Sequence, residues 1–422
     1  MLITAILLGT AFVLMLIGLP IAFSILAASI VALTTIGNIP LMVIPQNIFT
    51  GLDSFSLLAI PFFVLAGSLM TSGGITEKLL DLANSLMGRF RGGLAMSAVL
   101  SSAMFAGISG SAVADTSALG RIMIPAMKKA GYPANFSAGV LAAANVMAPI
   151  IPPSIPFIVV ATLTNQSVTT LFLAGLVPGL FYMATMLVMT SWISKRRGYP
   201  MHGRSSAADI WAATKGAIYA LLLPVFVIGG IRTGVFNITE CAVVAAVYAL
   251  FVGVFVYRKI NLRVFLKSLE SAARTTAVIM MIVAAAKAFS WVMAYVGIPR
   301  SVADFMLANI SDPLIFLILV NIILLIVGMF IETNAAIVML MPVFFPIAVS
   351  LGIDPTHFSV LMVVNLCIGL ITPPAGLCLN IATVLAGTTL EDGFKGVLPF
   401  FLMALFVIAV LTVFPQIVLV FT

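Results

Sequence analysis

The stretch GISGSAVADTS (residues 107–117) interrupts a long apolar region with small, hydroxylated and acidic residues. A second interruption, GMFIETNAA (residues 328–336), also contains a single carboxylate, Glu332, as the first contains Asp115. Inside a bilayer, such breaks are tolerated only where protein or water meets the freed backbone groups, and an intramembrane acid marks a candidate functional site. We therefore expect the function to reside at these two breaks.

The composition is that of a membrane protein. Hydrophobic residues make up 62% of the 422 residues and charged residues only 8%, whereas a soluble domain carries roughly 25% charged residues. This predicts an all-α polytopic membrane protein with roughly ten to fourteen spans of about 20 residues each. The net charge of +7 is explained by the basic bias of cytoplasmic loops, so it does not indicate a nucleic-acid partner.

Each polar break divides an apolar region into two stretches that are each short for a complete span. We therefore expect two re-entrant helical hairpins, at about 93–128 and about 313–350. Each hairpin is followed by an interrupted helix, at about 136–164 and about 358–387. Paired prolines break these two helices, because proline lacks a backbone donor and forces the preceding residue out of helical geometry.

Landmark residues of the two halves recur at a constant spacing of 221 positions. Glycine and proline are common here, so one match carries little weight, but seven matches at one spacing indicate an internal repeat. The matched pairs are Gly107 and Gly328, Pro125 and Pro346, Gly131 and Gly352, Pro152 and Pro373, Pro153 and Pro374, Gly175 and Gly396, and Pro178 and Pro399.

The repeat divides the chain into four parts. Residues 1–54 are expected to form N-terminal scaffold helices, in which 2–36 make either one bent helix or two short ones. Residues 55–194 form the first repeat and residues 274–422 the second. Between them, residues 195–273 are expected to form inter-repeat scaffold helices with basic cytoplasmic loops.

The basic residues predict the orientation of the two repeats. The stretches 195–204 and 258–267 are interpreted as loops separated by two spans, so both lie on the cytoplasmic side. Counting crossings from these loops, the first hairpin enters from the cytoplasm. The expected span at 274–296 crosses outward, so the second hairpin enters from outside, and the last span follows at 397–420. The two repeats are therefore inverted in the membrane.

Inverted repeats with interrupted helices near the midplane are typical of secondary transporters. The N-termini of half-helices suit an anionic substrate, whereas their C-termini and unwound turns present carbonyl oxygens that suit a hard cation such as Na⁺. Asp115 and Glu332 are interpreted either as ligands or as helix-capping acids. The spacing of 221 relates Glu332 to Ser111 and not to Asp115, so the two acids do not occupy equivalent positions of the repeat.

The candidate site residues lie at the hairpin tips or beside the breaks of the interrupted helices. Those assigned to substrate binding are Ser109, Gly110, Ser111, Asp115, Thr116, Asn145, Ser154, Thr333, Asn334 and Asn365. Those assigned to Na⁺, with two or more ions expected, are Ser109, Gly110, Ala148, Pro149, Glu332, Thr333, Asn334, Gly369, Thr372 and Pro373. No catalytic residue and no organic cofactor are expected.

Three runs carry a resemblance to a known family: FAGISGSAVADTSALGRIMIPAMKKAGYP (105–133), APIIPPSIPF (148–157) and ITPPAG (371–376). They resemble the DctM-like large membrane subunit of tripartite ATP-independent periplasmic (TRAP) transporters. The resemblance implies sodium-driven import of organic acids across the bacterial inner membrane. It also implies an elevator-type fold, with a scaffold domain and a mobile domain that contains the two hairpins. It also implies two partners, a small four-helix membrane subunit (DctQ-like) and a periplasmic substrate-binding protein (DctP-like).

The leading hypothesis is Na⁺-coupled uptake of a C4-dicarboxylate, a sialic or other sugar acid, or a keto acid through the lipid bilayer. Coupling to H⁺ through Asp115 and Glu332, or exchange, is the close alternative. A membrane-embedded enzyme is disfavoured because the sequence contains no HExxH, no Asp-rich motif for a phosphate-bound metal, and no paired nucleophile and histidine. Only about 55 residues precede the first repeat, so we expect the small subunit to be a separate chain.

Overall fold

A computed structural model describes residues 2–201, 203, 205–309, 312–374 and 376–422. The chain is 81% helical, and no β-strand occurs in the part of the chain that the structure describes. Within those residues, seven helices are long and apolar enough to cross a membrane. The predicted all-α polytopic class is confirmed.

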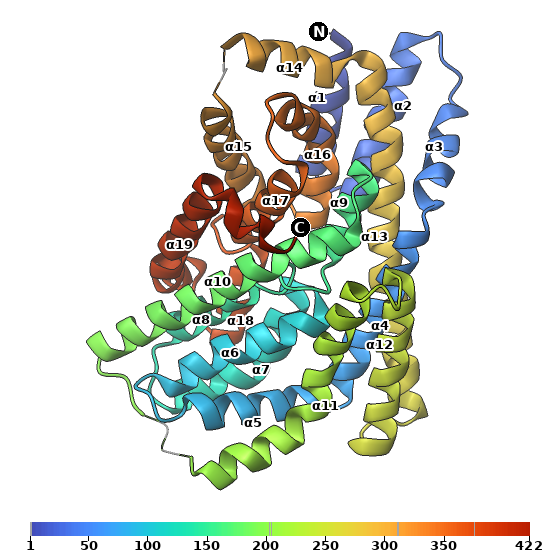
Figure 1. The fold of residues 1–422 in the computed structure, drawn as a ribbon. Coiled ribbons are helices and arrows are strands. Elements are labelled where there is room, and N and C mark those ends of the chain that lie inside the picture. The colour runs from blue at the N-terminus through green and yellow to red at the C-terminus, as the bar shows by residue number, and fades with distance from the viewer. Residues whose placement is uncertain (1, 202, 204, 310–311, 375) are drawn as a thin grey trace.

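One group of helices comes from the N-terminal part and the middle of the chain (Figure 1). It consists of α1 (Leu2–Leu16), α2 (Ile21–Ile36), α3 (Val43–Leu52), α4 (Ala59–Ser72), α11 (Ala207–Arg232), α12 (Ile238–Phe251) and α13 (Leu262–Val296). Helix α12 packs on α4, and α13 packs on α2, α3 and α4. With 35 residues, α13 is about 52 Å long at 1.5 Å per residue, which exceeds the hydrocarbon core of about 30 Å.

Helices α1 and α2 settle the question that the sequence left open for residues 2–36. They are two short helices of 15 and 16 residues that pack side by side. The chain reverses at Gly18, whose φ of 89° is a conformation that glycine adopts without steric cost. Each helix is only about 23 Å long, which is shorter than a hydrocarbon core of about 30 Å, and both open ends lie at the same end of the molecule (Figure 1).

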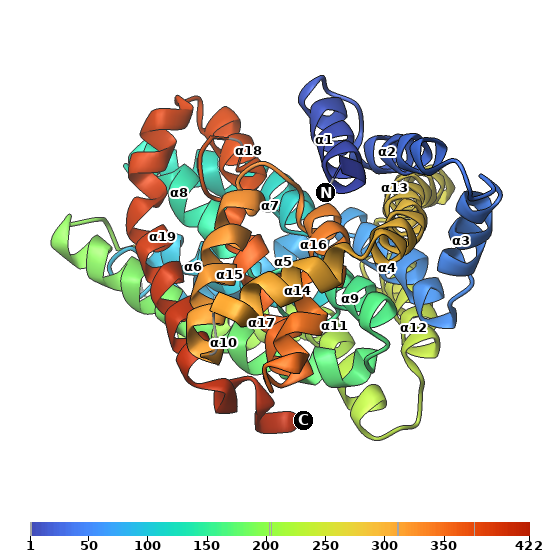
Figure 2. The same ribbon diagram turned by 90° about the horizontal axis from the view of Figure 1, so that it is seen from above.

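The second group of helices contains both hairpins and both interrupted helices. From the first repeat it contains α6 (Gly93–Ser109), α7 (Ala112–Lys129), α8 (Ala134–Asn145), α9 (Ile155–Thr164) and α10 (Val168–Arg196). From the second it contains α15 (Pro313–Gly328), α16 (Thr333–Ser350), α17 (Pro355–Gly369), α18 (Leu377–Ala386) and α19 (Leu390–Val413). Figure 2, seen from above, shows this group beside the group formed by α1–α4, α12 and α13.

Corresponding elements of the two repeats make corresponding contacts. The second hairpin helix of each repeat packs on the second half of the other repeat's interrupted helix, as α7 on α18 and α16 on α9. Likewise, α8 packs on α18 and α19, while α17 packs on α9 and α10. The amphipathic helices α5 (Ile75–Met87) and α14 (Ile298–Asn309) lie at opposite ends of the molecule (Figure 1). Their placement is that of an inverted pair.

Two predicted boundaries are wrong. The basic stretch 258–267 is not a loop throughout, because α13 begins at Leu262, where the Asn261 side chain accepts the Val264 N–H at 2.9 Å. The expected boundary at 273/274 therefore falls inside a continuous helix. The last span is displaced as well: Thr389 accepts the Asp392 N–H at 3.2 Å, so α19 starts at Leu390 and ends at Val413. Both helices begin after N-cap residues, Asn261 and Thr389, which a hydropathy pattern does not reveal.

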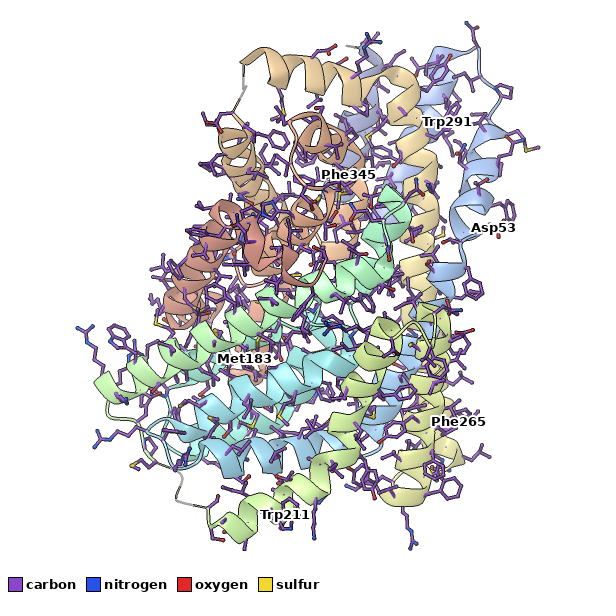
Figure 3. The ribbon with its side chains drawn as sticks, viewed as in Figure 1. Asp53, Met183, Trp211, Phe265, Trp291 and Phe345 are labelled. Atoms are coloured by element: carbon purple, nitrogen blue, oxygen red, sulfur yellow. The ribbon has the colours of Figure 1, made fainter. Side chains whose placement is uncertain are left out.

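Tryptophan side chains lie near opposite ends of the molecule. Figure 3 shows Trp211 at the lower end and Trp291 near the upper end. Trp211 is 62% exposed, and the Lys215 ammonium lies 5.3 Å from its ring centroid. Trp291 stacks on Tyr295 with the ring centroids 5.4 Å apart. Tryptophan and tyrosine at both levels are typical of the two interfaces of a bilayer.

The crossing of α8 and α19 generates a stability prediction. A Cβ at Gly396 would clash with the carbonyl oxygen of Asn135, whereas a Cβ at Gly229 in α11 would meet no atom within 4 Å. Overpacking costs about 1–3 kcal/mol. Gly396→Ala should therefore lower the thermal unfolding midpoint in detergent, and Gly229→Ala should hold or raise it, because alanine favours a helix interior over glycine. Equal midpoints for the two variants would show that the repeats do not meet at this crossing.

Candidate functional site

The first hairpin turns at a glycine followed by a capping serine. Helix α6 ends at Ser109, Gly110 adopts φ 63°, and the Ser111 hydroxyl accepts the Ala114 N–H at 3.4 Å to begin α7. A Cβ at Gly110 would lie 2.7 Å from the carbonyl oxygen of Pro153. Glycine is therefore required both for the left-handed turn and for the close approach of the hairpin tip to the first paired-proline loop.

Asp115 is fully buried behind this tip. One of its carboxylate oxygens accepts a hydrogen bond from the Ser109 hydroxyl, and the Ser109 oxygen accepts the Ser111 N–H at 3.2 Å. The second carboxylate oxygen, Oδ2, has no hydrogen-bond partner in the protein. Asp115 thus bridges the two helices of the hairpin through Ser109, and one acceptor remains available.

Glu332 has a different role at the second hairpin tip. Its carboxylate caps α16 by accepting the backbone N–H groups of Asn334 at 2.9 Å and Ala335 at 3.3 Å. It also accepts a bond from the Asn334 side-chain amide at 2.9 Å. Ser111 and Glu332, which stand 221 positions apart, are thus the N-caps of equivalent helices. The helix-capping interpretation fits Glu332, whereas Asp115 is held by a serine.

The interrupted helices are broken beside the two tips. Between α8 and α9, the buried Ser154 donates to the carbonyl of Pro149 and accepts the Phe157 N–H at 3.3 Å. The Pro152–Pro153 and Pro373–Pro374 peptide bonds are both cis. In the second repeat, α17 ends at Gly369, where a Cβ would lie 2.6 Å from the Cα of Gly328. Each break is therefore in direct contact with the hairpin of its own repeat.

A cavity of about 1550 Å³ connects these features. It is reached by both hairpin tips and by both breaks, the second through Leu370 and Leu377. The sequence-predicted site residues that line it are Gly110, Ser111, Pro149, Glu332, Thr333 and Asn334. The structure thus brings the tips of the two repeats to one volume.

The remaining predicted residues do not line this cavity. They are Ser109, Asp115, Thr116, Asn145, Ala148, Ser154, Asn365, Gly369, Thr372 and Pro373. The Thr116 hydroxyl donates to the Ala112 carbonyl of its own helix at 2.7 Å, and the Thr372 hydroxyl, in the break after α17, donates to the Ile368 carbonyl of that helix at 3.2 Å. Asn145 is 1% exposed, and neither of its amide atoms has a partner in the protein.

Asn365 belongs to a separate polar chain. Its amide donates to the backbone oxygen of Asn321 at 3.1 Å and to the side-chain oxygen of Asn321 at 2.8 Å. The Asn321 amide in turn donates to the Thr412 hydroxyl at 2.9 Å. This chain ties α15 to α17 and α19. Asn321 was missed from the sequence, although a single asparagine in the run PLIFLILVNIILLIVG (313–328) is the signal for a polar contact between membrane helices.

The opposite wall of the cavity comes from α1, α2 and α13 and is mostly apolar. Its exceptions lie on α13, where Arg274 and Thr275 face the same volume. Arg274 was also missed, because it stands at the expected first residue of a span and was treated only as a boundary.

The oxygen chemistry of the tips suits a hard cation. Among the described residues, no group of three or more His, Cys, Asp or Glu side chains is arranged to hold a metal ion. Buried polar atoms without partners occur instead on Asp115 (Oδ2), Asn145 and Asn334 (Oδ1). Single carboxylates combined with neutral oxygens fit Na⁺ better than a transition metal.

Comparison with known proteins identifies the family. The family model "Tripartite ATP-independent periplasmic transporter, DctM component" matches residues 8–417. The chain belongs to the DctM family. It is therefore the large permease component of a TRAP transporter and resides in the bacterial inner membrane.

Curated relatives span nearly the whole chain. The sialic acid TRAP transporter large permease protein SiaM of Vibrio cholerae is 38% identical over 94% of this chain and 93% of its own length. The 2,3-diketo-L-gulonate TRAP transporter large permease protein YiaN of Escherichia coli is 38% identical over 96% and 95%. The isethionate TRAP transporter permease protein DctMQ of Oleidesulfovibrio alaskensis is 38% identical over 95% of this chain and 63% of its own length. All three are named permeases, which points to a transporter and not an enzyme.

A solved structure shares the fold. The crystal structure of the YdaH transporter from Alcanivorax borkumensis superposes with a TM-score of 0.66 at 17% identity, over 91% of this chain and 89% of that one. At this identity the comparison shows the fold alone. The all-α polytopic fold predicted from the sequence agrees with it.

The two buried asparagines generate opposite predictions. Asn365→Leu removes a donor that satisfies two oxygens of Asn321, and leaving such groups unpaired costs about 1–3 kcal/mol. Asn145→Leu removes an amide that has no partner, so it should cost little or stabilise the protein. Unfolding midpoints in detergent should fall for Asn365→Leu and hold or rise for Asn145→Leu. The reverse order would show that Asn145 has the structural role.

Proposed function

We propose that this chain imports a small organic acid anion by Na⁺-coupled symport with an elevator movement. The observation that carries the proposal is the shared cavity, into which both inverted hairpins bring their tips. The named relatives transport sialic acid, 2,3-diketo-L-gulonate and isethionate. They have in common a small anionic organic substrate, and the cavity is large enough for such molecules.

The support for Na⁺ is the set of oxygens at the tips and breaks. Buried oxygens without a hydrogen-bond partner in the protein occur on Asp115 (Oδ2), Thr333 (Oγ1) and Asn334 (Oδ1), and the Glu332 carboxylate lines the cavity. Ala148, Pro149, Gly369, Thr372 and Pro373 are proposed to add main-chain carbonyl oxygens from the two breaks. We propose two or more Na⁺ ions, one for the oxygens of each tip.

The support for an anion is the N-terminus of α7. Both second hairpin helices point an N-terminus toward the cavity, but α16 is already neutralised by the Glu332 carboxylate. The α7 N-terminus is capped by the neutral Ser111 hydroxyl, and the acid of its first turn, Asp115, has its carboxylate bonded to the Ser109 hydroxyl instead of to the backbone N–H groups of that turn. Because helix N-termini attract negative charge, the substrate carboxylate is placed best at the first tip.

The support for an elevator movement is the division of the helices. We propose that α6–α10 and α15–α19 form the mobile domain and that α1–α4 and α11–α13 form the scaffold. The amphipathic helices α5 and α14 join the two parts at opposite ends of the molecule (Figure 1). The cavity lies between the hairpin tips on one side and α1, α2 and α13 on the other.

Membership in the DctM family implies a DctQ-like small subunit and a DctP-like periplasmic binding protein. We propose that both partners act with this chain in transport. This chain spans 63% of the DctMQ relative, which is consistent with a large and a small subunit joined in one chain in that relative.

Coupling is tested by uptake. Proteoliposomes that contain the chain and its small subunit, supplied with the binding protein loaded with a radiolabelled acid, should accumulate the acid when an inward Na⁺ gradient is imposed. Replacing Na⁺ with choline should abolish accumulation, and so should omitting either partner. Uptake that persists without Na⁺ and follows a pH gradient would favour the H⁺-coupled alternative. Full uptake by the chain alone would refute the role of the partners.

Glu332 generates a second test, with a matched control. Glu332→Gln keeps the size of the side chain but removes its negative charge beside the proposed ion, so half-maximal uptake should need about tenfold more Na⁺, or about 1.4 kcal/mol. Asp354 is also an N-cap acid, accepting the N–H groups of Thr356 and His357 at 2.8 and 2.9 Å, but it does not line the cavity. Asp354→Asn should leave the Na⁺ dependence unchanged. If both variants shift it equally, the effect comes from helix capping and not from ion binding.

A further inference from the structure

The two walls of the cavity differ in charge. The hairpin tips contribute Glu332, which is the one acidic side chain among the described residues that line it. The wall formed by α1, α2 and α13 is apolar along most of its length and ends at Arg274 and Thr275. Among the described lining residues, Arg274 is the one basic side chain. The acidic and the basic side chain that line the cavity therefore lie on opposite walls.

The ion pair that holds the Arg274 guanidinium is weak. Its ion-pair partner is Glu270, one helical turn earlier on α13, at 3.3 Å. The side chains of Arg274 and Glu270 are 79% and 70% exposed, and exposed pairs at this spacing are weak. Glu270 does not line the cavity. An incoming carboxylate can thus replace Glu270 at little cost.

The position of Arg274 in α13 also needs an explanation. The helix is apolar enough to cross the membrane, and a charged side chain within such a helix normally faces a water-filled cavity or a partner. Arg274 faces the cavity. Its planar, permanently charged guanidinium binds a carboxylate with two parallel hydrogen bonds, a geometry that lysine lacks.

We propose that Arg274 is an anion-binding residue that takes the carboxylate of the organic acid on the scaffold wall of the cavity. The inference rests on the proposed function and adds the group that recognises the anionic end of the substrate. Because α13 belongs to the scaffold, Arg274 stays in place while the tips move. It binds the anion transiently, before the anion enters or after it leaves the site at the hairpin tips.

The first experiment measures the electrostatic effect of Arg274 without knowledge of the substrate. A cysteine at Thr275, which also lines the cavity, is modified in the complex with the small subunit by an anionic or a cationic methanethiosulfonate reagent. The chain without this cysteine is the blank, since the native Cys241, Cys367 and Cys378 are all buried. Arg274→Gln should lower the ratio of anionic to cationic modification rates about tenfold.

Two control variants separate anion binding from a structural ion pair. Arg263→Gln removes a basic side chain on the same helix outside the cavity lining and should leave the ratio unchanged. Glu270→Gln frees Arg274 and should hold or raise the ratio. An unchanged ratio in Arg274→Gln, or an equal fall in Glu270→Gln, would overturn the proposal.

Uptake of a labelled acid by the same variants distinguishes this proposal from the proposed function. With Arg274→Gln, the rate of Na⁺-driven uptake should fall about tenfold, while the Na⁺ concentration for half-maximal uptake should stay within about twofold of wild type. If the wild-type complex takes up no acid in response to Na⁺ but the modification ratio still falls, the proposed function fails and the anion site remains. If the wild-type complex transports and Arg274→Gln transports equally well, the anion site fails and the proposed function remains.

Discussion

The constraint on which the structure depends is the need to satisfy backbone polar groups where helices stop inside the membrane. Each break meets this need with its own local partners: the Ser111 hydroxyl and the Glu332 carboxylate at the tips, and the Ser154 hydroxyl in the first proline loop. The tips then pack against the breaks, as Gly110 does against the Pro153 carbonyl. The tip residues Ser111 and Glu332 also line the cavity, so the candidate site arises from the same requirement that stabilises the fold.

The inverted repeat makes this gathering possible. Each repeat supplies one hairpin and one interrupted helix, and the two interlock because α7 packs on α18 and α16 packs on α9. Close approaches such as that of Gly396 to the Asn135 carbonyl allow helices from opposite repeats to touch along their backbones. Small residues at such crossings are the usual source of helix association in membranes, where lipid supplies no hydrophobic drive. The chemistry, however, is not symmetric, since equivalent positions hold Ser111 and Glu332.

Much of this architecture could be predicted from the sequence. The breaks at Gly110 and Glu332 and the repeated Gly and Pro positions are local or periodic signals, and they identified the hairpins, the interrupted helices and the family. The roles of individual side chains were less accessible. Asp115 proved to bond Ser109, only six residues earlier, because the turn at Gly110 brings the two helices of the hairpin together. Asn365 proved to bond Asn321 because such partners are set by packing between helices that are distant in sequence. Arg274 was overlooked for the same reason: only the fold shows that it faces the tips.

The short N-terminal pair α1 and α2 has a consequence for how the chain can be connected to others. Because this pair enters and leaves at one end of the molecule, it adds no net crossing, and its first residues share a side with α14 (Figure 1). The basic segments on either side of α11 and α12 lie at the other end, which the charge bias assigns to the cytoplasm. A polypeptide joined ahead of α1 must therefore finish on the outer side. A four-helix unit with both of its ends in the cytoplasm would need one additional crossing before it could be fused there.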